Sequence, residues 1–283
     1  MTGYREENKL IMDKNAPIGV FDSGVGGLTV AREIMRQIPN ERIVYFGDTA
    51  RVPYGSKSKD NIIKFSRQII RFLQTENVKA IVIACNTASA LALDEMQQEF
   101  DLPILGVVKP GAKVAVETTV NKRIGLIGTE ANIRSGVYTR YIKSLDDEAK
   151  VFEKACPLFV PLVEEGWLHD DITLQVASRY LEELKEKDID TLIMGCTHYP
   201  LIRSTIRKVM GDKVNLVNPA YETAIELKHL LERDNLANKC DVDSPSSKYR
   251  FYVSDAEEKF KLFANSILPF DITMTKQINI ENY

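Results

Sequence analysis

Two of the four cysteines follow short apolar runs and precede two polar residues. Cys85 lies in Ala80-Ile-Val-Ile-Ala-Cys-Asn-Thr, and Cys196 lies in Thr191-Leu-Ile-Met-Gly-Cys-Thr-His. A single free cysteine beside a buried strand is most often a small buried hydrophobic residue. Two cysteines in matched contexts instead favour a pair of thiols that work together as acid and base.

A weak internal repeat relates the two cysteine segments. Ile18-Gly-Val-Phe-Asp-Ser begins one half of the chain, and Ile124-Gly-Leu-Ile-Gly-Thr begins the other. Further along each half, a predicted buried apolar strand ends in a cysteine. Chance similarity would explain the apolar residues alone, but the shared order of small residue, cysteine and two polar residues favours a true repeat.

Both cysteines are expected at the carboxyl ends of parallel strands, where open α/β sheets bind their ligands. A helix that began directly after each cysteine would stabilise a thiolate with its free N–H groups. We therefore expect thiol pKa values below the unperturbed value of about 8.5. The other cysteines lack this context: Cys156 with Pro157 is expected to begin a strand, and Cys240 to lie in a polar loop.

The first strand is followed by a glycine-rich loop, Phe21-Asp-Ser-Gly-Val-Gly-Gly. The loop lacks the glycine spacing of dinucleotide sites and the Gly-Lys ending of phosphate loops, and the Asp22 carboxylate would repel a phosphate. Asp22 is better suited to bind a substrate ammonium or to contact a catalytic group. A turn or helix-capping role for Asp22 or Ser23 is the alternative.

Three further segments carry candidate site residues. In the loop Asp48 to Gly55, the backbone at Tyr54 and Gly55 could hold a carboxylate, although such a loop alone is only a turn. His198 could tune the nearby thiol or donate to a substrate carboxylate, whereas a structural role is the commoner one for such a histidine. Glu165 belongs to a Glu-Glu-Gly-Trp segment, for which the alternative is a charged helix start.

Apolar strand-length runs alternate with amphipathic runs, which predicts an α/β fold with parallel sheets covered on both faces. Predicted strands are Ile18 to Phe21, Ile43 to Gly47, Ala80 to Ala84, Ile104 to Val107, Arg123 to Ile127, Leu158 to Pro161, Thr191 to Met194, Val214 to Val217 and Tyr249 to Ser254. Predicted helices are Leu28 to Gln37, Lys59 to Glu76, Ala88 to Phe100, Gly111 to Thr119, Ser135 to Leu145, Ile172 to Lys187, Leu201 to Met210 and Ala224 to Glu232.

The repeat predicts two similar α/β domains with the active site in the cleft between them. We expect residues 17–109 and 220–283 to form the first domain, residues 110–219 the second, and residues 1–16 an N-terminal extension. In this prediction the end of the chain rejoins the first domain. The alternative is that it forms a third small subdomain.

The composition excludes several functions. The 283 residues are 44% hydrophobic and 27% charged, with a net charge of -3, which gives nucleic acid and acidic membranes no attractive field. No apolar run is long enough for a membrane span or an export signal, so a cytoplasmic protein is expected. The scattered cysteines and three histidines lack the spacing of a zinc site, so no metal is expected. The sequence leaves the oligomeric state open, a homodimer included.

Five blocks make the chain strongly similar to the glutamate racemase family, within the wider aspartate/glutamate racemase group. The blocks are Gly19 to Gly27, Tyr45 to Gly55, Ile83 to Ser89, Pro157 to Gly166 and Leu192 to Pro200. The resemblance implies glutamate as the small-molecule substrate, a role in peptidoglycan synthesis, and neither cofactor nor metal. Asn132 departs from the pattern, because the family usually has threonine there.

The resemblance also implies roles for individual residues. It assigns Cys85 and Cys196 as the catalytic acid/base pair, with Cys85 attacking the D enantiomer and Cys196 the L enantiomer. Asp22, Glu165 and His198 occupy positions that could assist the thiols. The implied substrate contacts are Asp22, Ser23, Tyr54, Gly55, Asn86, Thr87, Thr197 and His198.

Racemisation removes the α-proton from one face of the substrate and returns a proton to the other. An acid and a base on opposite faces can do this without moving, and two thiols from two related domains supply that arrangement. Two other functions remain open at this point: a racemase for aspartate or another acidic amino acid, and a non-catalytic binding protein for an acidic metabolite. A redox thiol protein is disfavoured, because no CxxC motif is present.

Overall fold

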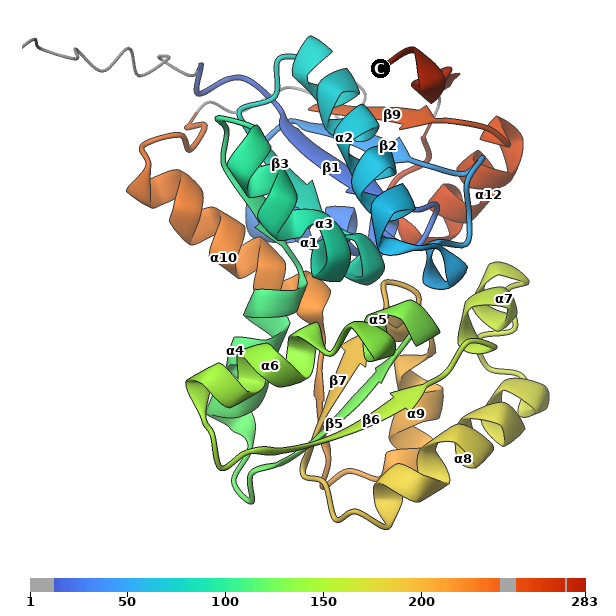
Figure 1. Cartoon of the computed structure of the whole chain (residues 1–283). Helices are drawn as coiled ribbons and strands as arrows, with labels where there is room; N and C mark the ends of the chain where they lie inside the picture. Colours follow the sequence, from blue (N-terminus) through green and yellow to red (C-terminus); the bar gives the residue numbers. More distant parts are fainter. Residues whose placement is uncertain (1–12, 240–247, 273) are drawn as a thin grey trace, which may run out of the picture.

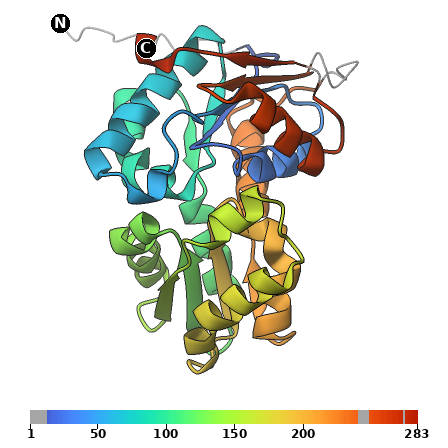
Figure 2. The ribbon, with the colours of Figure 1, turned by 90° about the vertical axis from the view of Figure 1, so that its right-hand side faces the viewer.

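The computed structural model describes residues 13–239, 248–272 and 274–283, which form two parallel α/β sheets with helices on both faces (Figures 1 and 2). The predicted fold class of two parallel-sheet α/β domains is confirmed. The expectation for Cys240, and most of the predicted N-terminal extension, lie outside the described residues.

The first sheet has six parallel strands in the order β10-β9-β2-β1-β3-β4. The central strands β1, β2 and β3 are buried at every residue, as expected for strands covered on both faces. The strands are β1 (Ile18–Asp22), β2 (Ile43–Gly47), β3 (Ala80–Ile83), β4 (Ile104–Gly106), β9 (Tyr249–Val253) and β10 (Thr275–Gln277).

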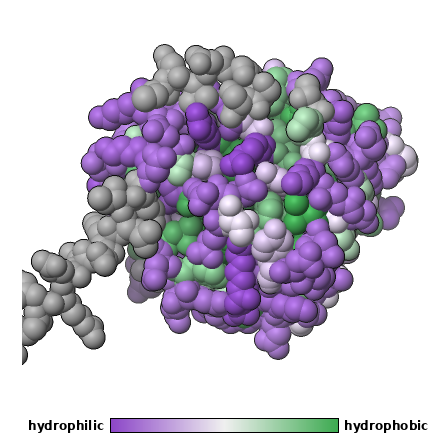
Figure 3. Space-filling model, turned by 90° about the horizontal axis from the view of Figure 1, so that it is seen from above, coloured by the Kyte–Doolittle hydropathy of each residue, from purple (hydrophilic) through white to green (hydrophobic). Residues whose placement is uncertain are grey.

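Two hydrophobic cores cover the faces of this sheet. Helices α1 (Leu28–Gln37), α10 (Pro219–Arg233) and α12 (Glu257–Ile267) pack on one face. Helices α2 (Lys59–Thr75) and α3 (Asn86–Glu99) pack on the other. Seen from above in Figure 3, the described surface of this domain that faces away from the second sheet is mostly hydrophilic, with only scattered hydrophobic patches.

The second sheet has four parallel strands in the order β6-β5-β7-β8, namely β6 (Lys150–Ala155), β5 (Arg123–Gly128), β7 (Thr191–Gly195) and β8 (Asn215–Val217). One face is covered by α7 (Phe159–Glu164), α8 (Asp171–Lys185) and α9 (Arg203–Met210). The other is covered by α4 (Val108–Thr118) and α6 (Val137–Leu145).

The chain passes between the sheets twice. Helix α4 begins two residues after β4 of the first sheet and packs on the second sheet. Helix α10 begins two residues after β8 of the second sheet and returns to the core of the first. Figure 1 shows both helices on the same side of the molecule, where they join its upper and lower parts. The exact residue boundaries of the two domains stay a prediction.

Several predicted elements are wrong. The run Leu158 to Pro161 was expected to be a strand, but it belongs to the short helix α7 and the turn before it. Pro161 lies in the first turn of that helix, where a missing N–H group costs nothing. Cys156 follows strand β6 instead of beginning a strand. The helix predicted from Ser135 to Leu145 begins only at Val137, as α6, because Gly136, whose φ of 61° is left-handed, separates it from the preceding helix α5 (Glu130–Ser135), which was not predicted.

Within the described residues, no helix is long and apolar enough to cross a membrane. The same part of the chain holds no group of three or more histidine, cysteine or acidic side chains placed to share a metal ion.

Candidate active site

Cys85 lies between the end of β3 and the start of α3, where its side chain caps the helix. The Ala88 N–H donates to the Cys85 Sγ at 3.5 Å, and the Sγ donates to the Ser23 Oγ at 3.7 Å. Burial raises the pKa of Cys85 to about 12, helped by the negative charge of Asp22, and the Ala88 N–H opposes this only weakly. The expected lowering of the Cys85 pKa is therefore wrong, because burial and a nearby carboxylate outweigh one helix N–H group.

Cys196 has different surroundings. No α-helix begins directly after it: a short 3₁₀ helix, Tyr199–Ile202, comes first, and α9 begins only at Arg203. The expectation of a helix N-terminus at this thiol is wrong. The Cys196 Sγ instead lies 3.7 Å from the Nδ1 atom of His198.

His198 connects Cys196 to a carboxylate. Its Nε2 atom lies 3.2 Å from the Oε1 atom of Glu164, at the end of helix α7. Burial lowers the pKa of His198, but the hydrogen bonds to Cys196 and Glu164 outweigh burial and raise that pKa to about 10. The imidazole is therefore charged at neutral pH, with one N–H for each partner.

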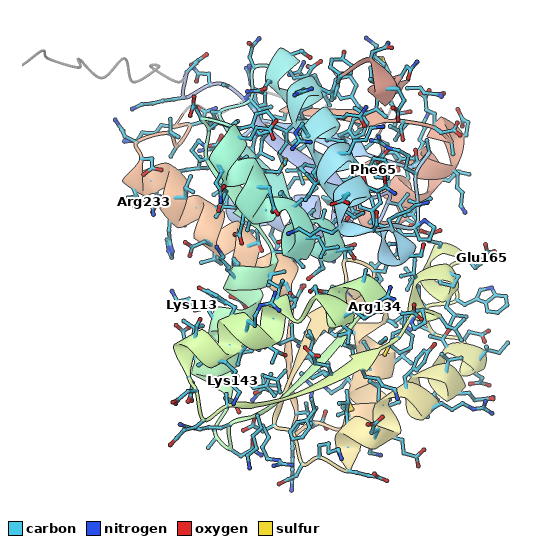
Figure 4. All side chains as sticks on the ribbon, viewed as in Figure 1. Phe65, Lys113, Arg134, Lys143, Glu165 and Arg233 are labelled. Carbon is cyan, nitrogen blue, oxygen red and sulfur yellow. The ribbon has the colours of Figure 1, made fainter. Side chains whose placement is uncertain are left out.

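The carboxylate beside His198 belongs to Glu164 and not to Glu165. Glu165 is exposed, and Figure 4 shows it at the outer edge of the molecule beside α7. Glu164 is partly buried, and its hydrogen bond to His198 lowers its pKa. Its second oxygen lies 4.0 Å from the Lys259 Nζ on α12 of the first domain.

Asp22 is fully buried at the carboxyl end of β1. Its Oδ2 atom accepts the Gly24 N–H at 3.1 Å, while its Oδ1 atom has no hydrogen-bond partner in the described part of the chain. Burial raises the pKa of Asp22, although the charge of His198 and backbone N–H groups lower it. Asp22 thus lies within electrostatic range of both His198 and Cys85.

A cavity of about 50 Å³ between the two domains contains both thiols on its wall. Nine of the residues predicted from the sequence line it: Ser23, Tyr54, Gly55, Cys85, Asn86, Thr87, Cys196, Thr197 and His198. Asp22 lies behind this wall, and Glu165 is not part of it. The structure therefore brings the predicted thiols and all but one of the predicted substrate contacts to one place.

The cavity also has lining residues that the sequence did not single out: Gly24, Val52, Pro53, Thr129, Val160 and Glu164. Thr129 follows β5 of the second domain and shares a hydrogen bond of 2.9 Å with Thr87 of the first. The repeat itself could have pointed to Thr129, because this residue has the same position in the second half of the repeat as Ser23 has in the first. Asn132 is buried and donates to the Gly195 carbonyl at 2.8 Å, away from the cavity wall.

This geometry suits proton transfer at a carbon atom. The cavity places one thiol from each domain on its wall, beside amide, hydroxyl and backbone donors that can hold anionic groups. The cavity has a volume of only about 50 Å³, so it has room for little water, and a site with little water strengthens these electrostatic interactions.

Comparisons with known proteins identify the family of the chain. A family model described as Asp/Glu/Hydantoin racemase matches residues 18–225. The glutamate racemase of Geobacter metallireducens is 44% identical over 264 residues, which cover 93% of this chain and 97% of that protein.

Solved structures give the same result. The crystal structure of glutamate racemase isoform RacE1 from Bacillus anthracis has a TM-score of 0.89 at 39% identity, covering 94% of this chain and 98% of that chain. The glutamate racemase of Francisella tularensis in complex with D-glutamate has a TM-score of 0.88 at 39% identity, covering 95% and 100%. From its sequence, its fold and its paired thiols, the chain belongs to the Asp/Glu/hydantoin racemase family and is an enzyme of the racemase class.

Proposed function

We propose that the chain interconverts L-glutamate and D-glutamate without a cofactor, using Cys85 and Cys196 as two opposed acid/base groups. The observation that carries this proposal is the shared cavity, whose wall contains one thiol from each domain. The names of the similar proteins, among them one solved with D-glutamate, support glutamate as the substrate.

Two bases explain the reaction without a large motion of either group. The substrate α-carbon would lie between the thiols; one, as thiolate, removes the α-proton while the other, as thiol, donates a proton to the opposite face. The roles exchange in the reverse direction. Following the family resemblance, we propose that Cys85 attacks D-glutamate and that Cys196 attacks L-glutamate.

The lining residues supply donors for the two carboxylates of glutamate. All five of the proposed donor residues line the same cavity, namely Asn86, Thr87, Thr197, Tyr54 and Gly55. Hydrogen bonds to the α-carboxylate stabilise the negative charge that develops when the α-proton leaves. Donors of this kind favour an amino acid with two carboxylates over one with a neutral side chain.

The charged imidazole of His198 lies beside the Cys196 sulfur, where it can pair with the negative charge that this group carries while it acts as the base. Glu164 holds the other side of the imidazole and so keeps it oriented toward the thiol. We propose Glu164, in place of Glu165, as the carboxylate that assists this side of the site. Asp22 is proposed to act on the Cys85 side, where its charge already influences the thiol.

The test is an assay of the purified chain with each enantiomer of glutamate and of aspartate, followed by circular dichroism. We expect both glutamate enantiomers to approach the same racemic mixture and aspartate to remain unchanged. Loss of optical activity with aspartate alone would overturn the proposed substrate, and no change with any amino acid would overturn the activity.

The proposed biological role is the supply of D-glutamate for peptidoglycan in a bacterial cytoplasm. Expression of the chain should allow a bacterium that requires external D-glutamate to grow without it. Growth only with the supplement, despite soluble expression of active enzyme, would contradict this role.

A further inference from the structure

Tyr138 makes a buried hydrogen bond from one domain to the other. It is the second residue of α6 in the second domain, it is 1% exposed, and its phenol donates to the Asn86 Oδ1 at 2.7 Å. Asn86 directly follows Cys85 and begins α3 of the first domain. Figure 1 shows α5 and α6 at the top of the second domain, beneath α3.

This bond determines how the Asn86 amide is oriented. With Oδ1 occupied by the phenol, the Nδ2 group is the half of the amide that remains for a ligand, and it makes no hydrogen bond within the described residues. Asn86 is 4% exposed and lines the cavity between the thiols. An amide N–H would attract a carboxylate there, whereas the amide oxygen would repel it.

The phenol is held in its donor form. Burial raises the pKa of Tyr138 far above its usual value, and the charge of Cys196 adds to this effect. Tyr138 therefore keeps its proton across the pH range in which enzymes work. A neutral phenol next to the amide oxygen is a stable arrangement for this buried position.

We infer that Tyr138 is a positioning residue that fixes the Asn86 amide with its N–H groups toward a substrate carboxylate, and that it does so only when the two domains are closed. The inference rests on the proposed function, because it takes the ligand to be the carboxylate of an amino acid. Tyr138 is not required to touch the substrate.

A second bond on the opposite side supports this interpretation. The Thr29 Oγ1 on α1 of the first domain lies 2.9 Å from the Thr197 carbonyl in the second domain and can donate to it. Thr197 directly follows Cys196, as Asn86 directly follows Cys85. The residue after each cysteine thus accepts a hydrogen bond from the other domain. Contact between the domains therefore positions both sides of the site together.

The direct test is the variant Tyr138→Phe, which removes only the hydroxyl group. Without this hydroxyl the Asn86 amide is no longer held in one orientation, which should weaken its charge-assisted hydrogen bond to the substrate. We therefore expect KM to rise by about tenfold for both glutamate enantiomers, with a smaller change in kcat. The control is Tyr180→Phe on α8 of the same domain, whose phenol accepts the Leu158 N–H and which is not among the residues that line the cavity. That control should leave KM unchanged.

A double-mutant cycle distinguishes positioning from general damage. If Tyr138 acts through Asn86, Tyr138→Phe should raise KM in the wild type but not further in an Asn86→Ala background. The near-isosteric Asn86→Asp keeps an acceptor for Tyr138 and replaces the Nδ2 donor with a negative oxygen, so it should raise KM more than Tyr138→Phe does. This second variant also tests the inference if Tyr138→Phe folds poorly.

Three outcomes would overturn the inference. They are an unchanged KM in folded Tyr138→Phe, an equal rise of KM in the Asn86→Ala background, and an unchanged KM in Asn86→Asp. An inactive wild-type chain would overturn the proposed function together with the inference. An active wild type with any of the three outcomes overturns the inference alone.

Discussion

The two thiols of the cleft have unequal electrostatic surroundings. Cys85 lies near the carboxylate of Asp22, and burial raises its pKa to about 12. Cys196 lies beside the charged imidazole of His198. Cys85 should therefore keep its proton in the free enzyme, which suits it to act as the acid when L-glutamate is the substrate in the proposed mechanism.

The raised pKa of His198 predicts a dependence of stability on pH. The folded chain holds the His198 proton up to about pH 10, whereas the unfolded chain releases it near pH 6.5. The stability from this proton is fully present below pH 6.5 and is lost as pH rises toward 10, by at most about 1.4 kcal/mol per pH unit. Replacing His198 with Gln removes this contribution.

Urea denaturation at pH 6.0 and pH 8.5 measures the effect. The free energy of unfolding of the wild type should exceed that of His198→Gln by more at pH 6.0 than at pH 8.5. A difference between the two proteins that is constant, or that grows with pH, would show that His198 is not protonated in the folded enzyme.

Single residues show where sequence reasoning succeeds and fails. The cysteines and the residues after them were predicted, because type and position in the repeat carry the signal. Glu164 was missed in favour of Glu165, since only the turn of α7 decides which of two adjacent glutamates faces His198. Tyr138 gave no signal, because its partner Asn86 is 52 residues away in the chain.

At the scale of elements, strands buried on both faces were predicted well. An apolar run such as Ala80–Ile83 forms few structures other than a buried strand in an α/β fold. Strand β6 was missed because it is an edge strand that pairs only with β5, so its residues, Lys-Val-Phe-Glu-Lys-Ala, are half-exposed and of mixed type. The run at Leu158 to Pro161 was misassigned because a short apolar run can form either a helix or a strand, and its pattern alone does not distinguish the two.

The loop between β1 and α1 contacts the opposite domain at Gly26. A Cβ atom added at Gly26 would lie 2.5 Å from the His198 ring and would also clash with the Thr197 side chain. Gly26→Ala should therefore force the domains apart and displace the groups around Cys196. We expect kcat/KM to fall by about 100-fold, the cost of a displacement near 1 Å.

Steady-state kinetics and thermal unfolding of Gly26→Ala check this prediction together. Because the clash lies between the domains, the melting temperature should change much less than the activity. Near-normal kcat/KM would mean that the two domains need not approach as closely as in this structure.

A buried lysine ties three segments at the other end of the first sheet. Lys79 is 1% exposed, and its Nζ lies 2.5 Å from the Glu41 Oε2, 2.6 Å from the Lys14 carbonyl and 2.9 Å from the Leu236 carbonyl. Lys79→Met would leave the Glu41 carboxylate buried without its partner. We expect the free energy of unfolding to fall by about 3–5 kcal/mol.

This loss should not affect the reaction, since Lys79 precedes β3 and Cys85 follows it at the opposite end. Urea denaturation should show the loss, with kcat and KM unchanged at 25 °C. The double variant Lys79→Met/Glu41→Met should recover part of the stability. A fall in kcat without a fall in stability would contradict a purely structural role.

At the scale of the whole molecule, the structure represents a closed enzyme. The cavity at the thiols is small, about 50 Å³, with room for a few water molecules. Among the residues that the structure describes, three hydrogen bonds join the domains around this cavity, made by the pairs Tyr138 and Asn86, Thr87 and Thr129, and Thr29 and Thr197. Separation of the domains would break all three of these bonds, and helices α4 and α10 would remain as the connections between the domains.

Closure is also what the sequence could least predict. The repeat indicated two domains and placed both thiols at strand ends, because local patterns specify strands and their order. The distance between the domains depends on contacts such as that of Gly26 with the His198 ring, which no local pattern contains.

The central claim is that Cys85 and Cys196 act as separate bases on opposite faces of the substrate. Proton exchange at the α-carbon in heavy water tests it most directly, with each glutamate enantiomer on the wild type, Cys85→Ala and Cys196→Ala. Early in the wild-type reaction, deuterium should appear in the product enantiomer and not in the remaining substrate, and neither variant should racemise. Equal early labelling of both enantiomers by the wild type, or full racemisation by either variant, would contradict the two-thiol mechanism.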